Sequence, residues 1–581
     1  MGENTTSGHC NKIRFRFPKN PRAQRHTGSS TCKIRHRPTR TAGLSLSSLQ
    51  QGIPVNPRPQ SILANGSWTP SIGSTVFQAI NPTTQLAMPQ VFPVSPWSEI
   101  DGVIAAAAQV SREMRGWPGI RFAEFLERYA EEIEARADLL VETAHAETGL
   151  PKSPRLRDGE LPRTTNQLRQ AAGSARDESW RVPTIDTATN IRSMFGPLGP
   201  VVVFGPNNFP YAYNGIAGGD FAAAIAAGNP VIAKGHPCHP ETTRIFGEAA
   251  VAAIQACGMP PALVQLIYRT SHEDGLRLVS DPRIGGVGYT GARQTGLRLK
   301  AAADAAGKPI YLELSSINPV FMLPGALRER LQKIVDEFTA SCLMGAGQFC
   351  TNPGLIVVPA GELGDAFTAT AAERFAAAPS GTMLSEGVRT AFLAAIQKLQ
   401  AAGAKLVTGG EPGGGTGVCC RNTLLQVSAT AFMADPHTFQ TEAFGNGSLI
   451  VHADSPTQMA ELAELLEGNL TGSIYSDTQG SDDAHYSLLE KVVRTKVGRM
   501  LNDKMPTGVA VVASMNHGGP FPATGHPGFT AVGVPASVTR FGMLQSFDAI
   551  RPQRLPAVLQ DRNPGSVWRR INGTWTQADV G

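Results

Sequence analysis

Apolar strands and helices alternate between residues 199 and 310, and this alternation restricts the fold more than any other feature. The strand-like runs PVVVF and NPVIAK lie on either side of a helix predicted over 219–227. A helix predicted over 242–257 leads to ALVQLIY, and IGGVGYT follows as a fourth strand. Repeated strand–helix units require parallel strands joined by right-handed crossovers. The segment therefore predicts a doubly wound parallel sheet of the kind that binds dinucleotides.

A second α/β region follows, and 581 residues are enough for more than one hydrophobic core. The runs YLELSSINPVFML and GLIVV are strand-like, with a helix predicted between them over 327–344. We expect an α/β fold with an NAD(P)-binding domain over 61–310 and a catalytic domain over 311–510. Residues 511–581 should return to the cofactor and oligomerisation region and become weakly ordered beyond about Pro552.

Residues 1–60 form a basic segment in which Glu3 is the only acidic residue. Its low apolar content predicts a disordered tail. A targeting peptide, a solvated tail and a translated leader all fit this composition. The formal net charge of +5 comes from this segment, and the remainder is mildly acidic. A nucleic-acid-binding role would therefore depend on the tail alone, and we expect no nucleic-acid partner.

Cysteine spacing and hydropathy argue against several other classes of protein. The chain has eight cysteines and no C-x-x-C pair, so neither a structural metal nor a disulfide framework is predicted. A reducing cytoplasm is the simplest compartment for such a chain. The apolar run Phe221–Ala233 is interrupted by Gly228 and Pro230, whereas a membrane span needs roughly 18–20 apolar residues. We therefore expect no membrane association.

The stretch SCLMGAGQFCTNPG, residues 341–354, places Cys350 on tightly bent backbone just after a helix. Gly345 and Gly347 break the helix, and Pro353 turns the chain after the cysteine. Bent backbone presents a side chain and frees N–H groups, which suits a nucleophile beside an oxyanion site. A small buried hydrophobic residue is the alternative role for Cys350.

Three polar residues fall in or just after predicted strands, where ligand crevices form in parallel sheets. Asn208 offers an amide that donates to an oxyanion without titrating, although it also fits an ordinary turn. Glu313 lies among apolar residues, which would desolvate a general base, unless it is an exposed strand residue. Lys234 could meet ribose hydroxyls or phosphate, or it could be solvated.

The dinucleotide signal is weak as a motif, because the chain lacks G-x-G-x-x-G. The run TGARQTG, from Thr290 to Gly296, stands where a strand turns into a helix. Free N–H groups at such a turn favour a pyrophosphate. Taken alone, the run predicts cofactor binding less often than not.

Six motifs in order give the chain its family resemblance: GPNNFP, NPVIAKGHP, YTGARQTG, ELSSINP, MGAGQFCTNPG and TEAFGN. Over roughly residues 70–550 the chain resembles the aldehyde dehydrogenase superfamily. The runs KGHPCHP, GQFCTNPG and HGGPFPATGHP resemble the branch that oxidises α-ketoglutaric semialdehyde, together with its NADP-linked relatives. Oxidation of an aldehyde to a carboxylate, through a cysteine thiohemiacetal and thioester, is what the resemblance implies.

The resemblance also implies a role for individual residues. Cys350 would be the nucleophile, Glu313 the base, and Asn208 with the Cys350 backbone N–H the oxyanion hole. The cofactor would be held at the riboses, the nicotinamide and the pyrophosphate by Lys234, Glu442, Phe444, Gly291 and Gly296. Family members of this kind assemble as dimers or tetramers through a hairpin, and residues 178–194 are its counterpart here.

Departures from the family pattern predict the cofactor and the substrate. Pro237 stands where many NAD-using members carry a glutamate, so NADP becomes acceptable and is expected to be preferred, with NAD possible. The expected substrate is 2,5-dioxopentanoate, the α-ketoglutaric semialdehyde, with Arg163 meeting its carboxylate and Phe209 lining the site. A fatty or other aldehyde remains an alternative substrate.

A cofactor-independent thiol hydrolase is the competing hypothesis. It requires a histidine beside Cys350, and no histidine falls in a segment that resembles such a site. A non-catalytic binder that uses the basic tail is the third hypothesis.

Overall fold

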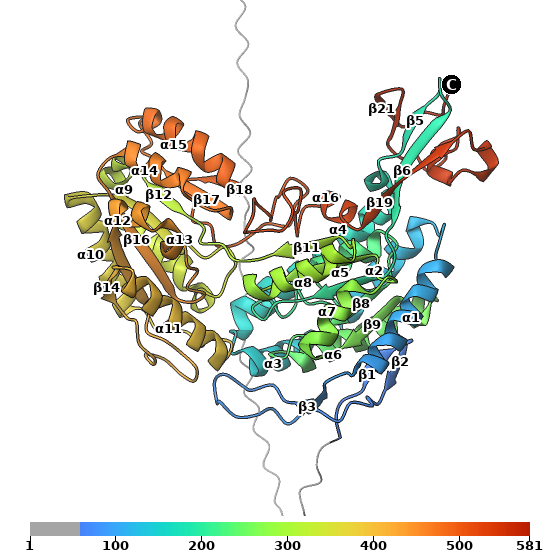
Figure 1. The fold of residues 1–581 in the computed structure, drawn as a ribbon, viewed down its shortest axis with the longest axis horizontal. Helices are drawn as coiled ribbons and strands as arrows, with labels where there is room; N and C mark the ends of the chain where they lie inside the picture. The colour runs from blue at the N-terminus through green and yellow to red at the C-terminus, as the bar shows by residue number, and fades with distance from the viewer. Residues whose placement is uncertain (1–57) are drawn as a thin grey trace, which may run out of the picture. The chain divides into compact units, whose positions relative to one another are not determined.

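The structure, a computed structural model, describes residues 58–581 (Figure 1). The basic tail predicted for residues 1–60 lies outside the described residues, except for its last three. Among the described residues, no helix combines the length and the apolar character that a bilayer crossing requires.

The first sheet is the predicted doubly wound sheet, and the α/β prediction is confirmed. Its parallel strands run in the order β11-β10-β7-β8-β9. Their bounds are β7 (Val201–Phe204), β8 (Val231–Lys234), β9 (Val264–Ile267), β10 (Gly286–Thr290) and β11 (Ile310–Glu313). Nearly every side chain of these strands is buried, as expected for a sheet covered on both faces. The sequence did not predict the antiparallel extension beyond β9, formed by β1 (Ile62–Ala64) and β2 (Ser67–Thr69).

Eight helices of the described chain accompany this sheet: α1 (Trp97–Glu113), α2 (Gly119–Glu134), α3 (Ala137–Thr148), α4 (Leu161–Asp177), α5 (Gly219–Ala226), α6 (Pro240–Cys257), α7 (His272–Ser280) and α8 (Arg293–Ala305). Helical spacing puts Phe122, Phe125, Leu126 and Tyr129 on the buried face of α2. Burying each such side chain contributes about 1.5–3 kcal/mol. The Tyr129 hydroxyl group lies 2.9 Å from the carbonyl oxygen of Ile216, to which it donates.

The second sheet has the order β14-β15-β16-β13-β12-β17-β18, and only β14 is antiparallel. Its strands are β12 (Val320–Met322), β13 (Leu355–Pro359), β14 (Lys405–Thr408), β15 (Thr423–Ser428), β16 (Gly447–Ala453), β17 (Asn469–Tyr475) and β18 (Val497–Asn502). Its helices are α9 (Pro324–Leu343), α10 (Glu362–Ala377), α11 (Glu386–Ala401), α12 (Ala429–Ala434), α13 (Pro436–Phe439), α14 (Pro456–Glu464) and α15 (Asp483–Lys496). The cysteine loop joins α9 to β13, so this sheet carries the thiol.

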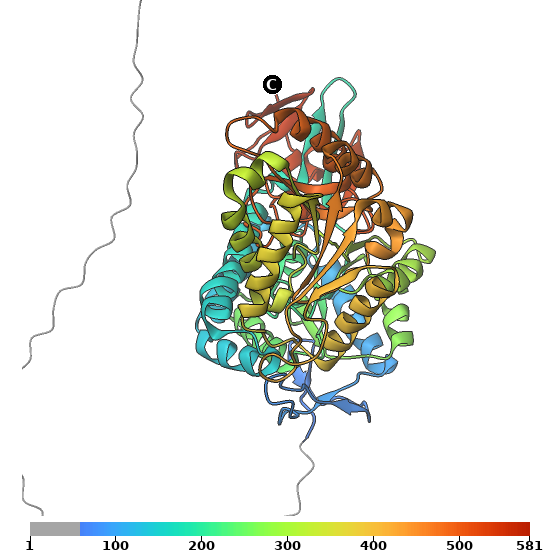
Figure 2. The same cartoon turned by 90° about the vertical axis from the view of Figure 1, so that its left-hand side faces the viewer.

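A third sheet has the order β19-β6-β5-β20-β21. It consists of β5 (Thr184–Asp186), β6 (Ile191–Pro197), β19 (Gly542–Asp548), β20 (Arg569–Ile571) and β21 (Thr574–Thr576). Figure 1 and Figure 2 both show the β5–β6 hairpin beside the C-terminal segment. The smaller elements are β3 (Val76–Phe77), β4 (Phe92–Pro93) and α16 (Ala536–Thr539).

The prediction of a weakly ordered tail beyond about Pro552 is wrong. The buried Arg569 guanidinium donates to the carbonyl oxygens of Asp561 and Ala578, at 3.1 and 2.7 Å, and so ties the C-terminal segment together. Asn572 and Gly573 form the turn between β20 and β21, and both have positive φ, at +48° and +86°. An Asn-Gly pair is a strong hairpin signal in a sequence, and it was available here.

Candidate active site

The Cys350 loop has the bent backbone that the sequence predicts. Gly345, Ala346 and Gly347 all have positive φ, at +56°, +56° and +67°. A Cβ on Gly347 would lie 2.0 Å from the carbonyl oxygen of Gly445, so only glycine fits there. The Asn318 amide donates to the carbonyl oxygen of Cys350 at 2.9 Å and so helps to hold the loop in place.

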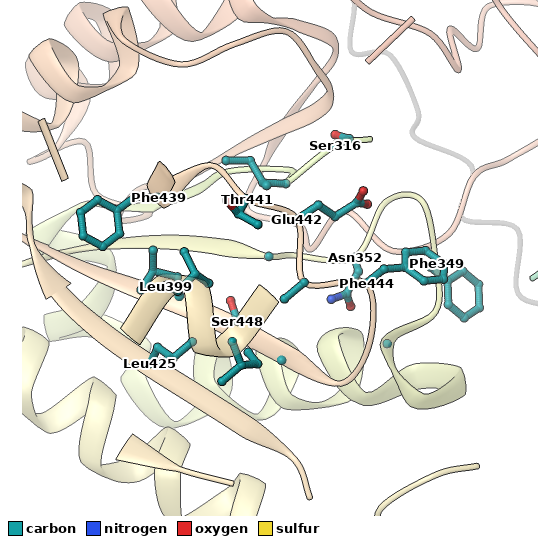
Figure 3. A pocket seen from close by; sticks show the side chains of 17 residues that line it. Ser316, Phe349, Asn352, Leu399, Leu425, Phe439, Thr441, Glu442, Phe444 and Ser448 are labelled. Atoms are coloured by element: carbon teal, nitrogen blue, oxygen red, sulfur yellow. The ribbon is translucent and has the colours of Figure 1, made fainter. Parts of the chain in front are cut away.

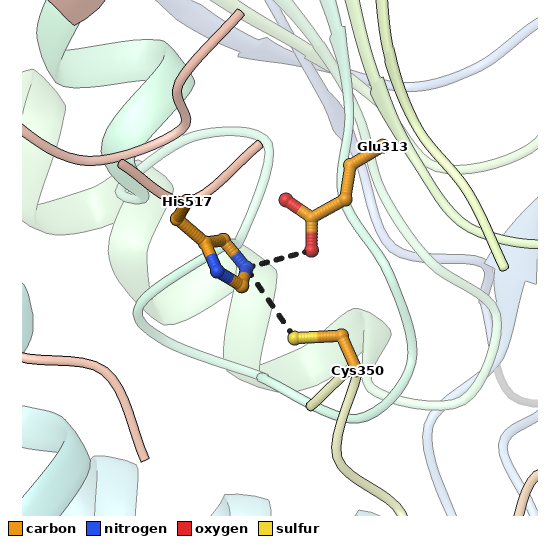
Figure 4. A group of neighbouring side chains, drawn as sticks. All are labelled: Glu313, Cys350 and His517. Atoms are coloured by element: carbon orange, nitrogen blue, oxygen red, sulfur yellow. Dashed lines mark hydrogen bonds and ion pairs between the residues drawn. The ribbon is translucent and has the colours of Figure 1, made fainter. Parts of the chain in front are cut away.

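Cys350, His517 and Glu313 lie together, and they come from three separate segments (Figure 4). The Cys350 Sγ is 3.4 Å from the His517 Nε2, which is 2.9 Å from the Glu313 Oε1. The side chains of His517 and Glu313 are only 2% and 1% exposed. Burial raises the pKa of the Cys350 thiol well above its usual range, and the Glu313 charge raises it further. The resting thiol therefore keeps its proton at neutral pH.

His517 lies beside Cys350, although no histidine falls in a segment whose sequence resembles a thiol hydrolase site. His517 follows Cys350 by 167 residues and lies in an irregular Gly- and Pro-rich segment. That segment is held along β11, because Leu314 N–H donates to the Ala523 carbonyl oxygen at 2.8 Å and Gly525 N–H donates to that of Leu312 at 3.0 Å. Proximity created by loop-to-strand pairing leaves no local sequence signal, apart from the run HGGP itself.

Asn208 lies in the turn after β7, and its side chain faces the cysteine loop. One N–H of its amide donates to the carbonyl oxygen of Gln348 at 3.0 Å, two residues before Cys350. An amide nitrogen carries two N–H donors, so a second one remains for a ligand. The residue is 6% exposed, which would make any hydrogen bond to an oxyanion a desolvated one.

Arg155 clamps the Asn208 turn, and the sequence did not predict this role. It lies in a short π-helical segment, η1 (Lys152–Glu160), and donates to the carbonyl oxygen of Asn208 at 3.0 Å. It also pairs with Glu160 at 2.7 Å, and Glu160 accepts from the Tyr211 N–H at 2.8 Å. The guanidinium lies 4.4 Å above the ring of Phe209. Two buried charges thus fix the turn that carries Asn208.

Arg163 and Phe209, the predicted substrate residues, form one wall with Tyr213. The Arg163 Nη2 donates to the Tyr213 hydroxyl at 3.2 Å, and its guanidinium lies 5.5 Å from the Phe209 ring. Phe209 in turn meets the ring of Phe349 edge to face, with centroids 5.4 Å apart. Phe349 is the residue before Cys350, so this wall adjoins the thiol. The Arg163 charge is close enough to lower the pKa of the Cys350 thiol, against the larger effect of burial.

The predicted cofactor residues of the first sheet lie at its carboxyl edge. Lys234 ends β8, and burial lowers its pKa to about 8. Gly291 follows β10, and its N–H donates to the Glu313 carbonyl oxygen at 3.1 Å. A Cβ on Gly291 would lie 2.8 Å from the Tyr289 hydroxyl, and one on Gly296 would lie 2.4 Å from Leu314. Both glycines therefore let the side chains of Tyr289 and Leu314 pack closely against the backbone at this edge.

Glu442 and Phe444, the two cofactor residues predicted on the second sheet, line one pocket (Figure 3). Phe349 and Asn352, which flank Cys350 in the sequence, line the same pocket. Burial raises the pKa of Glu442 to about 7, and hydrogen bonds from Ser315 and Ser316 partly oppose this rise. The structure thus brings the predicted Glu442 and Phe444 to the cysteine loop.

Two α/β sheets that position a partly exposed thiol beside a buried carboxylate and a buried imidazole define an α/β protein with a thiol-centred site. The profile of the aldehyde dehydrogenase family matches residues 68–492, and the chain belongs to that family.

Curated relatives share much of the sequence. The chain is 40% identical over 495 residues to alpha-ketoglutaric semialdehyde dehydrogenase 2 of Azospirillum brasilense, a match that covers 83% of this chain and 93% of the relative. It is 34% identical over 537 residues to alpha-ketoglutaric semialdehyde dehydrogenase of Acinetobacter baylyi, covering 89% and 98%. Among solved structures, aldehyde dehydrogenase C of Pseudomonas syringae, complexed with NAD⁺ and octanal, superposes with a TM-score of 0.72 at 20% identity, covering 86% of this chain and 98% of that one.

Proposed function

We propose that this protein oxidises 2,5-dioxopentanoate, the α-ketoglutaric semialdehyde, to 2-oxoglutarate with NADP. The observation that carries the proposal is that the Cys350 thiol lies beside His517 and Glu313, with the Asn208 amide bound to its loop and Arg163 in the adjoining wall. The two relatives described above bear the name of this activity, at 40% and 34% identity.

In the proposed reaction, the Cys350 thiol transfers its proton toward His517 and Glu313 and attacks the aldehyde carbon. The resulting oxyanion accepts hydrogen bonds from the Asn208 amide and from the backbone N–H of Cys350. When bound, NADP supplies the hydride acceptor that turns this adduct into a thioester. Glu313 then takes a proton from water, the hydroxyl adds to the thioester carbon, and Cys350 leaves and regains a proton. The product is the carboxylate.

Residues of both sheets fit a nicotinamide dinucleotide. Lys234 and Glu442 would hold ribose hydroxyls, Phe444 would pack against the nicotinamide, and the backbone turn between Gly291 and Gly296 would face the pyrophosphate. The N–H groups of Gly291 and Gly296 already donate to the carbonyl oxygens of Glu313 and Ala292, at 3.1 and 3.0 Å, so the backbone N–H groups between these glycines are the ones that would meet the pyrophosphate. Pro237 brings no carboxylate that would repel a 2′-phosphate, which supports NADP over NAD.

The first experiment compares initial rates with NADP and NAD, each against 2,5-dioxopentanoate and pentanal. We expect the highest kcat/KM for 2,5-dioxopentanoate with NADP. Turnover of pentanal alone would contradict the proposed substrate and favour the fatty or other aldehyde alternative. Equal kcat/KM with NADP and NAD would contradict the cofactor preference.

Arg163 is the proposed partner of the substrate carboxylate. A charged hydrogen bond contributes about 1.5–3 kcal/mol, so Arg163→Gln should raise KM for 2,5-dioxopentanoate roughly tenfold to hundredfold and leave pentanal unaffected. Arg169→Gln is the matched control, because Arg169 lies on the same helix and pairs with Glu134 at 2.6 Å. Equal losses on both aldehydes would remove Arg163 from this role.

A dimer or tetramer built through the third sheet is the proposed assembly, and the cytoplasm stays the predicted compartment. Strand β19 is an edge of that sheet, with Met543 and Leu544 exposed by 48% and 61%. An unpaired edge strand with exposed apolar side chains favours pairing with another chain. Light scattering coupled to size exclusion measures the mass, and a monomer at micromolar concentration would contradict the proposal.

His517 favours a second candidate activity, the hydrolysis of activated esters without a nicotinamide. Its Nε2 lies within reach of both the Cys350 thiol and the Glu313 carboxylate, as a thiol hydrolase requires. p-Nitrophenyl acetate should be hydrolysed in the absence of NADP, and His517→Asn should slow this reaction at least tenfold relative to His526→Asn. An equal rate in both variants would refute the role of His517.

A further inference from the structure

The donor atoms of Cys350, His517 and Glu313 all lie within 4.8 Å of one another (Figure 4). Sulfur, imidazole nitrogen and carboxylate oxygen are the three ligand types that zinc takes in proteins. Tetrahedral zinc, with bonds of about 2.3 Å to sulfur and about 2.0–2.2 Å to nitrogen and oxygen, holds its ligand atoms roughly 3.4–3.6 Å apart. The Sγ to Nε2 distance of 3.4 Å already matches, and the Nε2 to Oε1 distance of 2.9 Å needs only a small expansion.

The charges of the three ligands also favour Zn²⁺. A cysteine thiolate and a glutamate carboxylate carry two negative charges, which a divalent cation neutralises, and a neutral cluster avoids most of the cost of a buried charge. The Glu313 Oε2 is buried and has no hydrogen-bond partner among residues 58–581. It therefore offers a free ligand atom, or a hydrogen-bond acceptor for a water in the fourth position.

We propose that Cys350, His517 and Glu313 bind Zn²⁺ and that bound zinc reversibly blocks the thiol. On binding, the Cys350 S–H bond breaks, its proton goes to solvent, and a Zn–S bond forms. His517 binds as neutral imidazole through Nε2, and no electron is transferred. The proposed binding rests on the geometry of the three donor atoms, whereas the loss of aldehyde oxidation rests on the proposed role of Cys350 as nucleophile.

Cobalt(II) reports on this site without an activity assay, because a thiolate bound to Co²⁺ absorbs in the near ultraviolet. We expect the chelator-treated full chain to develop this band at one equivalent of Co²⁺. The band should be absent in Cys350→Ser and should need at least tenfold more Co²⁺ in His517→Asn. His526→Asn is the matched control and should behave as the unaltered protein. Equal titrations of His517→Asn and the control would overturn the proposal.

Alkylation of the unaltered protein tests the site without any variant. Zn²⁺ in a non-chelating buffer should slow iodoacetamide modification of Cys350 at least tenfold, read by peptide mass spectrometry, and should leave the partly exposed Cys257 unchanged. EDTA should restore the rate. Unchanged alkylation of Cys350 in the presence of Zn²⁺ would overturn the site.

Aldehyde oxidation, measured alongside, should be lost with Zn²⁺ and recovered with EDTA. Protection of Cys350 in a protein that oxidises no aldehyde would uphold the zinc site and refute the proposed function instead. Full oxidation while Cys350 is protected would refute the block of the thiol by zinc.

Discussion

Replacing Arg155 by methionine tests whether the buried ion pair positions the Asn208 turn. Arg155 and Glu160 have side chains that are 13% and 0% exposed, and their charged atoms lie 2.7 Å apart. Methionine keeps an unbranched side chain but removes the charge, the donor to the Asn208 carbonyl oxygen and the cation–π contact with the Phe209 ring. Glu160 would be left as a buried carboxylate.

The expected magnitude follows from these contacts. Removing one member of a buried ion pair costs about 3–5 kcal/mol. The N–H groups of Tyr211 and Ala212, at 2.8 and 3.0 Å, still donate to Glu160 and keep the cost near the lower bound. Deletion of an oxyanion donor lowers kcat by about 10²–10³. Asn208 is displaced rather than deleted, so we expect kcat to fall roughly tenfold to hundredfold.

Urea unfolding followed by fluorescence measures the stability change, and single-turnover rates measure the effect on chemistry. Arg157→Met is the matched control: it alters the same segment, but Arg157 pairs with Asp138 at the surface, with side chains 44% and 89% exposed. Surface pairs contribute little, so the control should behave as the unaltered protein. If Arg155→Met and the control agree in unfolding midpoint and in single-turnover rate, the clamp has no role.

Three further predictions concern the chemistry and the cofactor. Glu313→Gln should slow deacylation and accumulate a Cys350 acyl adduct visible by mass spectrometry; an unchanged steady state without adduct would exclude Glu313 as the base. Glu442, with its pKa raised to about 7, is ionised above that pH, and Lys234, with its pKa lowered to about 8, is charged below it. NADP should therefore bind most tightly between about pH 7 and 8 by equilibrium titration, and a flat Kd from pH 6 to 9 would contradict their roles. Pro237→Glu should lower the NADP-to-NAD ratio of kcat/KM at least tenfold through repulsion of the 2′-phosphate, and an unchanged ratio would remove that argument.

Local patterns predicted the parts of the molecule that local physics determines. The apolar runs of β7 and β8 gave strands buried on both faces, and Lys234 ends β8 as expected. The helix predicted over 327–344 is α9, at Pro324–Leu343. Glycine spacing predicted the bend before Cys350 because left-handed backbone there needs Gly345 and Gly347.

Other parts have no periodic signal. Arg155 lies in KSPRLRDGE, a polar run that reads as a solvated loop, and only the folded chain shows that its guanidinium is covered by Phe209 and Phe349. The C-terminal hairpin was missed for the opposite reason. The Asn572-Gly573 turn signal is present in the sequence, but the residues around it are mostly polar and do not stand out as two short strands.

Glu313 shows why the site could be predicted from the sequence only in part. Its main chain belongs to β11, where register with Thr290 brings its carbonyl oxygen to the Gly291 N–H of the cofactor turn. Its side chain points to His517, whose segment pairs with the same strand through the Leu312 carbonyl oxygen and the Leu314 N–H. One residue thus joins the cofactor turn to the thiol by two different chemical groups. Because glutamine keeps the backbone bonds and most of the side-chain shape, Glu313→Gln tests the side-chain link alone: slowed deacylation with unchanged NADP affinity assigns the carboxylate to chemistry, and weakened NADP binding would contradict a support of the turn by the backbone carbonyl alone.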